Sequence, residues 1–198
     1  MKKIHIGLVG LALLGLLSCK NDQNKDAADD MVQEEVKEET MVKEVEEEVK
    51  KVTLNLESRS GSQATGEATF TETDGKITFV AMISGLEPGT HAIHIHETAD
   101  CSADDATSSG GHWNPTFEKH GKWGAEDGYH KGDIGNFVAN AEGNGRIAMT
   151  TDQWCIGCGD EKKDILGKAI IVHKGADDFT SQPSGAAGAR VSCGGIIQ

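Results

Sequence analysis

The chain has 198 residues, of which 32 are acidic and 19 are Lys or Arg, so its formal net charge is −13. This length fits one domain with additional segments. The acidic balance, with no basic stripe to neutralise phosphates, excludes a typical nucleic-acid-binding protein. Glycine is abundant at 25 residues, proline is rare at 3 and aromatic residues make up only 5%. A core built from Val, Ile, Ala and Leu suits a β-sandwich or β-barrel better than a helix bundle.

Residues 1–19 have the pattern of a lipoprotein signal peptide. Lys2 and Lys3 precede an apolar run over residues 4–17, which is shorter than the roughly 20 residues that a membrane-spanning helix needs. The run ends in Leu-Leu-Ser-Cys, which resembles a lipobox, so the lipid would be attached to Cys19. The alternative is an ordinary signal peptide followed by a coincidental cysteine. We expect an exported protein that the lipid anchors to the membrane of a bacterial cell envelope, facing the periplasm or the cell surface, where disulfides persist.

Residues 20–51 are polar and highly charged, and we expect them to form an acidic tether. The spacings between Val42, Val45, Val49 and Val52 alternate between three and four residues. Residues with these spacings lie on one stripe of a helix. A short coiled coil is therefore the alternative, but two heptads are too few to hold by themselves and Val is a mediocre helix former. We favour a solvated tether, helical or not, between the lipid and a domain over residues 52–198.

From residue 52 onward the hydrophobic period changes to two, as in strands with one buried face. Asp74-Gly75 and the segment around Gly143 each interrupt such a pattern and predict hairpins. We expect about eight strands, over residues 52–56, 68–71, 76–83, 91–96, 136–141, 146–151, 168–173 and 190–197. Two glycine-rich connections, 98–133 and 174–189, have a length typical of functional loops. The sequence thus predicts an all-β Greek-key barrel or sandwich with two long functional loops.

The histidines of this region are placed as metal ligands would be. His94 and His96 are two apart on a predicted strand, so both imidazoles lie on the same face. One loop then supplies three imidazoles and a carboxylate, from His112, His120, His130 and Asp133. This donor set suits tetrahedral zinc. His173 ends a strand that is distant in sequence, as expected for a ligand delivered by the fold. Imidazole suits copper and zinc alike, so the ligand type does not distinguish the two metals.

Residues 52–198 resemble the copper–zinc superoxide dismutases, segment by segment and in the same order. The matching segments are Gly89-Thr90-His91-Ala92-Ile93-His94-Ile95-His96-Glu97, Gly110-Gly111-His112-Trp113-Asn114-Pro115, His120-Gly121, His130-Lys131-Gly132-Asp133-Ile134-Gly135-Asn136, Ile171-Val172-His173, Ala176-Asp177-Asp178 and Gly188-Ala189-Arg190-Val191-Ser192-Cys193-Gly194. Ala92 and Ile93 depart from the family's usual Gly-Phe, a packing change that should leave the ligands alone.

The resemblance implies a set of metal ligands and a role for each of several other residues. Copper would be bound by His94, His96, His112 and His173, and zinc by His112, His120, His130 and Asp133. His112 would then bridge both metals, whereas His91 would be a structural histidine. The resemblance also implies that Asp177 links a copper histidine to a zinc histidine and that Cys101 pairs with Cys193. Arg190 would dock a small anion beside the copper.

The implied activity is dismutation of superoxide to oxygen and hydrogen peroxide, by a copper that cycles between two oxidation states beside a structural zinc. Arg190 and His112 are the implied catalytic residues. The alternative is a non-enzymatic envelope protein that binds copper and zinc, or handles copper, on the same scaffold. Bacterial members of the family occur as monomers and as dimers, so a homodimer stays open.

Cys155 and Cys158 form a C-x-x-C motif outside the family pattern. A small local disulfide, an exposed redox pair and an accessory metal clip are the three alternatives. A thioredoxin-type motif needs a βαβ setting, which this sequence does not predict. Because disulfides persist outside the cytoplasm, we favour the local disulfide.

Overall fold

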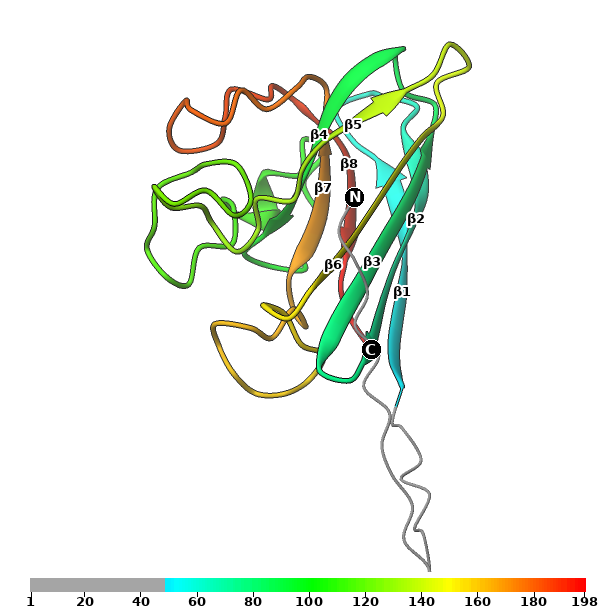
Figure 1. Ribbon diagram of the computed structural model, residues 1–198. Coiled ribbons are helices and arrows are strands. Elements are labelled where there is room, and N and C mark those ends of the chain that lie inside the picture. Colours follow the sequence, from blue (N-terminus) through cyan, green and yellow to red (C-terminus); the bar gives the residue numbers. More distant parts are fainter. Residues whose placement is uncertain (1–48) are drawn as a thin grey trace, which may run out of the picture. The chain divides into compact units, whose positions relative to one another are not determined.

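The computed structural model describes residues 49–198, so the predicted signal peptide, Cys19 and nearly all of the predicted tether lie outside the described residues. The strands are β1 (Lys50–Ser58), β2 (Thr65–Thr73), β3 (Lys76–Ser84), β4 (Gly89–His96), β5 (Gly135–Ala139), β6 (Gly145–Thr151), β7 (Ala169–His173) and β8 (Arg190–Gly195) (Figure 1). The helical structure in this range is one 3-10 turn, η1 (Thr107–Ser109). The described residues include no helix long and apolar enough to cross a membrane.

The eight antiparallel strands close into a barrel in the order β1-β2-β3-β6-β5-β4-β7-β8, and β8 pairs with β1 to complete it. The pairs β3–β6 and β4–β7 join strands that are not consecutive in the chain. The order β3-β6-β5-β4 is that of a Greek key, because β4, β5 and β6 lie side by side in chain order and β3, which precedes them in the chain, pairs with β6. The predicted all-β barrel of eight strands is confirmed.

The two predicted hairpins are present, and their turns have the expected backbone. Asp74 and Gly75 have φ of 51° and 67°, the positive values that the two central residues of a type I′ turn require. Between β5 and β6, the side-chain oxygen of Asn140 accepts hydrogen bonds from the backbone N–H groups of Glu142 and Asn144. Local turn chemistry therefore determines both connections.

The start of β1 differs from the sequence-based expectation. Lys50 and Lys51, which the sequence assigns to the tether, pair with Glu72 and Thr71 of β2. The pairing extends two residues before Val52 because β2 continues to Thr73 and offers a partner. Two charged residues at a barrel end give no hydrophobic alternation from which this extension could be predicted.

Strands β4 and β7 are buried on both faces, unlike most of the barrel. Every residue of β7 is buried, as are the last six of β4. Ile93 and Ile95 point into the main hydrophobic core, so His94 and His96, which alternate with them, point to the outer face. The two long loops lie over this face beside β4 and β7 (Figure 1). The site is therefore built between the outside of the barrel and its two long loops.

Both predicted disulfides are formed. Cys101 pairs with Cys193 and links the first long loop to β8, across a sequence separation of 92 residues. A closed loop of this size stabilises the fold by about 4–5 kcal/mol in the chain-entropy model. Cys155 pairs with Cys158 in the connection between β6 and β7, which agrees with the local disulfide favoured from the sequence.

Candidate metal centre

Four histidines from three parts of the chain meet on the outer face of β4. His94 and His96 come from β4 itself, and His173 is the last residue of the neighbouring strand β7. His112 arrives on the first long loop, which pairs with the end of β4 through a bridge between His96 and His112. The backbone N–H of Trp113 also donates to the carbonyl of Ile95 at 2.9 Å. Backbone pairing therefore fixes where His112 lies relative to the strand histidines.

The described residues contain two groups of side chains able to hold a metal ion, and both groups are buried. The four-histidine group consists of His94, His96, His112 and His173. The three-histidine group consists of His112, His120, His130 and Asp133. Within each group the donor atoms all lie within 4.8 Å of one another. The sequence predicted both sets, and the structure brings all seven residues together with His112 in common.

Six buried ring nitrogens in these groups have no hydrogen-bond partner, and they are His94 Nδ1, His96 Nε2, His112 Nε2, His120 Nδ1, His130 Nδ1 and His173 Nε2. A buried polar atom left without a partner costs about 1–3 kcal/mol. Such atoms are rare in folded proteins and need an explanation. Every one of the six belongs to one of the two groups, which is the pattern expected if metal ions complete the site. The donor sets thus fit two metal ions.

In the four-histidine group, the ring nitrogen opposite the free one is held by the protein. His96 Nδ1 donates to the carbonyl of Gly110 at 2.9 Å, and His173 Nδ1 to that of Gly188 at 3.3 Å. His94 Nε2 donates to Asp177 Oδ2 at 2.9 Å. These bonds fix the tautomer and the ring orientation, as outer partners of metal-binding histidines do. In each of these three rings the free nitrogen is therefore the unprotonated, basic one.

Burial favours the neutral form of His96, His112 and His173. It lowers the pKa of His96 and His173 well below the usual value, and it lowers that of His112 to about 4. The neighbouring imidazoles act in the same direction, because a second positive charge nearby is unfavourable. A neutral imidazole is the form that binds a metal ion.

Asp133 is the centre of the three-histidine group. Its Oδ1 lies 2.8 Å from His112 Nδ1 and 3.3 Å from His130 Nδ1, and its Oδ2 lies 3.1 Å from His120 Nδ1. Burial raises the pKa of Asp133, but the three histidine rings around its carboxylate outweigh this effect and hold the pKa far below its usual range. The group therefore offers three imidazoles and an ionised carboxylate, the donor types of a tetrahedral zinc site.

Asp177 connects the two groups by binding one histidine of each. Its Oδ2 accepts from His94 Nε2, and its Oδ1 accepts from His120 Nε2, both at 2.9 Å. Burial lowers the pKa of His120, but the carboxylates of Asp133 and Asp177 beside its ring outweigh this effect and raise the pKa to about 9. One buried carboxylate thus orients a histidine of each group.

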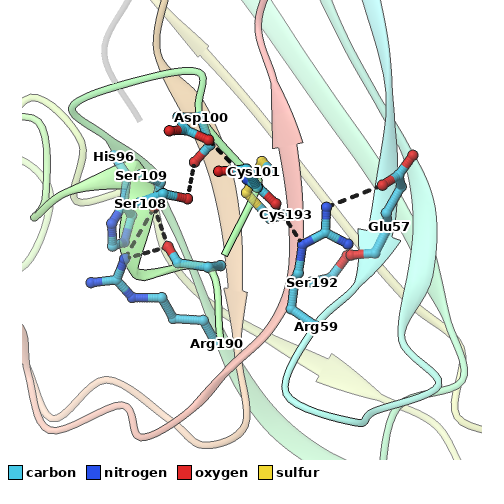
Figure 2. The surroundings of a disulfide bond; sticks show 12 residues. Glu57, Arg59, His96, Asp100, Cys101, Ser108, Ser109, Arg190, Ser192 and Cys193 are labelled. Atoms are coloured by element: carbon cyan, nitrogen blue, oxygen red, sulfur yellow. Dashed lines mark hydrogen bonds and ion pairs between the residues drawn. A yellow bond between two sulfur atoms is a disulfide. The ribbon is translucent and has the colours of Figure 1, made fainter. Parts of the chain in front are cut away.

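Arg190 lies at the rim of the four-histidine group. Its Nη1 donates to the carbonyl of Ala106 at 2.8 Å and to Ser109 Oγ at 3.0 Å. Figure 2 shows the guanidinium beside His96 (Figure 2), and its positive charge contributes to the lowered pKa of His96 and of His173. Only one nitrogen of the guanidinium fork is used by these contacts, so the others are available to an anion.

Comparison with known proteins agrees with this arrangement. The family model described as copper/zinc superoxide dismutase (SODC) matches residues 64–196. The chain belongs to this family. It is 36% identical over 135 residues to superoxide dismutase [Cu-Zn] 2 of Aquifex aeolicus (strain VF5). The aligned residues cover 66% of this chain and 78% of that protein.

Solved structures that share this fold are also similar to the chain in sequence. The crystal structure of a SOD-like protein from Bacillus subtilis has a TM-score of 0.65 and 31% sequence identity, and covers 73% of this chain and 97% of that one. The clock protein EA4 has a TM-score of 0.64 and 33% identity, and covers 74% of this chain and 94% of that one.

Two amide side chains that support this dismutase-family site are not singled out by the sequence. Gln182 makes a reciprocal pair with the backbone of His120, accepting from its N–H and donating to its carbonyl, both at 2.9 Å. Asn136 makes the same kind of pair with the backbone of Asp177, with both bonds at 2.8 Å. Asn136 falls inside a segment that matches the family, which is the one signal the sequence offers for either residue.

Gly185 is a third residue that the sequence does not single out. It has φ of +67°, and a Cβ built on it would lie 1.8 Å from Asp177 Oδ1 and 2.7 Å from His120 Nε2. The second long loop therefore passes directly over the bond between Asp177 and His120, and only glycine leaves room for that bond.

His91 lies close to the site and belongs to neither group. Both of its ring nitrogens face backbone carbonyl oxygens, that of His173 at 2.9 Å and that of Glu87 at 2.7 Å. It is buried and supports the backbone of His173 without belonging to the metal-binding groups.

Proposed function

We propose that the protein is a copper–zinc superoxide dismutase, which converts superoxide to oxygen and hydrogen peroxide. Copper would be held by His94, His96, His112 and His173, and zinc by His112, His120, His130 and Asp133. The observation that carries this proposal is the set of six unpartnered buried ring nitrogens, all of which belong to two donor groups that share His112. Copper bound at this site would supply one-electron redox chemistry by alternating between its cupric and cuprous states.

His112 can contact both ions because its two ring nitrogens face different groups. Nδ1 lies in the three-histidine group beside Asp133, and Nε2 is free in the four-histidine group. No other residue belongs to both groups. Because Nδ1 faces Asp133 and Nε2 has no protein partner, Nε2 would either bind copper or, when it does not, hold a proton at the four-histidine group.

Arg190 supplies the positive charge that a small anion needs beside the four-histidine group. The chain as a whole is net negative, so attraction of superoxide depends on local positive potential. Steering of superoxide by such a local field is itself a standard example of electrostatically assisted association. The Ala106 carbonyl and Ser109 hydroxyl hold the guanidinium in one orientation, so its remaining donors are fixed before the anion arrives.

Superoxide turnover by the copper- and zinc-loaded full chain tests this function, with the Arg190→Gln variant as the matched comparison. We expect the variant to keep both metals and to have a kcat/KM about 10- to 100-fold lower, the effect of losing a hydrogen bond to a charged group. Rapid turnover by the unaltered chain together with this loss supports the dismutase. Full copper binding without turnover in either protein contradicts it.

A copper-binding protein without dismutase activity is the second candidate. It is compatible with the descriptions of two structural relatives, a SOD-like protein and a clock protein, neither of which is described as a dismutase. The complete donor groups and the placement of Arg190 favour the enzyme instead, because storage of copper does not need an anion-docking cation. The turnover measurement separates the two candidates.

We further propose that the domain is exported and lipid-anchored through Cys19, with the residues between Cys19 and the start of β1 as the tether. The two disulfides support an extracytoplasmic location. Mass spectrometry of the N-terminus in a bacterial host should find a diacylated or triacylated Cys19, and Cys19→Ser should move the protein from the membrane to the soluble fraction. An unmodified mature N-terminus at another residue would contradict the lipid anchor.

A further inference from the structure

The turn between β1 and β2 contacts the segment that holds Arg190. Arg59 Nε donates to the carbonyl of Cys101 at 2.9 Å, and the backbone N–H of Arg59 donates to the carbonyl of Val191 at 2.9 Å. The Arg59 side chain is only 18% exposed. One residue of the turn thus binds both partners of the Cys101–Cys193 linkage, the loop on one side and the strand β8 on the other. In Figure 2 the disulfide lies between the guanidinium groups of Arg59 and Arg190 (Figure 2).

Ser60 repeats this double attachment. Its backbone N–H donates to the carbonyl of Asp104 at 2.7 Å, and its hydroxyl donates to the carbonyl of Arg190 at 2.8 Å. Asp104 is two residues before Ala106, whose carbonyl holds the Arg190 guanidinium. The turn therefore fixes the backbone of Arg190 and the loop that receives its side chain.

The Arg59 guanidinium is itself rigidly held. Besides the Cys101 bond, Nη1 donates to the carbonyl of Ser58 at 2.8 Å and Nη2 donates to Glu57 Oε2 at 3.1 Å. All three nitrogens are engaged, so little further side-chain freedom is lost when the loop docks. The disulfide joins the loop to β8 at Cys101, and the bonds from Arg59 to Cys101 and from Ser60 to Asp104 attach the same loop to the turn between β1 and β2.

We propose that Arg59 is a positioning residue for Arg190. By holding the loop of residues 101–109 against β8, Arg59 fixes the Ala106 carbonyl, and through it the direction in which the Arg190 guanidinium presents its free donors. This inference rests on the proposed function in one respect, namely that Arg190 docks the anion at the copper centre.

The test is the affinity of azide for the copper- and zinc-loaded full chain, followed by the spectrum of the cupric ion. Arg59→Gln should weaken azide binding by about 3- to 10-fold, the effect of losing a hydrogen bond that orients the docking group. Arg146→Gln is the matched control, because it removes the same charge from an exposed position on β6. We expect this control to bind azide as the unaltered chain does. Equal azide affinity in the Arg59→Gln variant and the unaltered chain would overturn the proposal.

A double-variant cycle separates positioning from general loosening of the fold. If Arg59 acts through Arg190, the Arg59→Gln change should have no further effect on azide affinity when Arg190→Gln is already present. An undiminished effect in that background would contradict the inference. If the Arg59→Gln variant does not fold, Ser60→Ala replaces it in the test. Ser60→Ala removes only the hydroxyl bond to the Arg190 carbonyl, and it should also weaken azide binding. Azide affinity unchanged by Ser60→Ala would in that case count against the proposal.

The outcomes also separate this inference from the proposed function. A chain that binds azide at copper but does not dismutate would refute the enzyme and leave the positioning role testable by azide affinity. A chain that dismutates superoxide and binds azide equally well with and without the Arg59→Gln change would refute the positioning role alone.

Discussion

The buried carboxylate of Asp177 accepts a hydrogen bond from His94 at 2.9 Å, although 83 residues separate them in the chain. The same carboxylate holds His120 through its other oxygen. Because His94 belongs to one donor group and His120 to the other, the orientation of both groups depends on one side chain that is a ligand in neither. The second long loop, which carries Asp177, is therefore part of the metal centre.

Replacing Asp177 by Asn should weaken metal binding without removing a ligand. An amide has one acceptor oxygen, so one of the two ring N–H groups would lose its partner and face the amide NH2. We expect zinc affinity about 10- to 100-fold lower, as for other outer partners of metal-binding histidines. Competition with a chelator measures this affinity. Asp178→Asn is the control, since its carboxylate binds only its own loop at Thr180 and Ser181. Equal affinities in the two variants would contradict the role of Asp177.

Gly185→Ala should cause a similar loss of zinc affinity. Its methyl group would overlap the Asp177 carboxylate, so the carboxylate or the loop must move. Gly167→Ala is a matched control, because Gly167 also has a positive φ, +78°, but a Cβ there meets nothing within 4 Å. Backbone strain alone would make the two variants equal in zinc affinity, whereas the overlap predicts a loss confined to Gly185→Ala.

His112→Ala and His96→Ala should differ in which metals they release. His112 belongs to both groups, so its removal should lower the affinity for copper and for zinc, each by more than about 10-fold. His96 belongs only to the four-histidine group, so its removal should lower the copper affinity and spare zinc. Metal analysis after dialysis against a graded chelator measures both. Full zinc retention in His112→Ala would show that His112 does not bridge the groups.

The two disulfides should make unequal contributions to stability. Replacing Cys101 and Cys193 by Ser should lower the free energy of unfolding by about 4–5 kcal/mol in the chain-entropy model, against about 2 kcal/mol for Cys155 and Cys158, because the first pair closes a much longer loop. Denaturant unfolding checks the difference. Only the first replacement should also reduce turnover, since the loop that it frees holds Arg190 through Ala106. A loss of turnover when Cys155 and Cys158 are replaced, but not when Cys101 and Cys193 are replaced, would contradict this assignment.

The barrel was predictable because a strand with one buried face leaves a period of two in its own residues. Val52, Leu54 and Leu56 alternate inward along β1, and Asp74-Gly75 has the chemistry of its turn. The eight strands and both hairpins follow from such local patterns. The extension of β1 to Lys50 does not, because two lysines carry no periodic signal and only the partner strand orders them.

The metal-binding residues were predictable for a different reason. Chemistry restricts them to a few residue types, and their resemblance to a known family supplied the grouping. Gln182 binds the backbone of a residue 62 positions away, and Arg59 one 42 positions away. Glutamine, arginine and glycine are common in loops for many reasons, so only the three-dimensional approach of distant segments reveals what Gln182, Arg59 and Gly185 do.

Superoxide turnover measured as copper is returned to the zinc-loaded, copper-free chain tests the central claim most directly. If the protein is a copper–zinc superoxide dismutase, turnover should rise in proportion to bound copper, reach its maximum at one copper per chain, and vanish when the copper is removed again. A chain that fills both donor groups and shows no dismutation at full copper occupancy would contradict the enzyme and leave a copper-binding protein on this barrel.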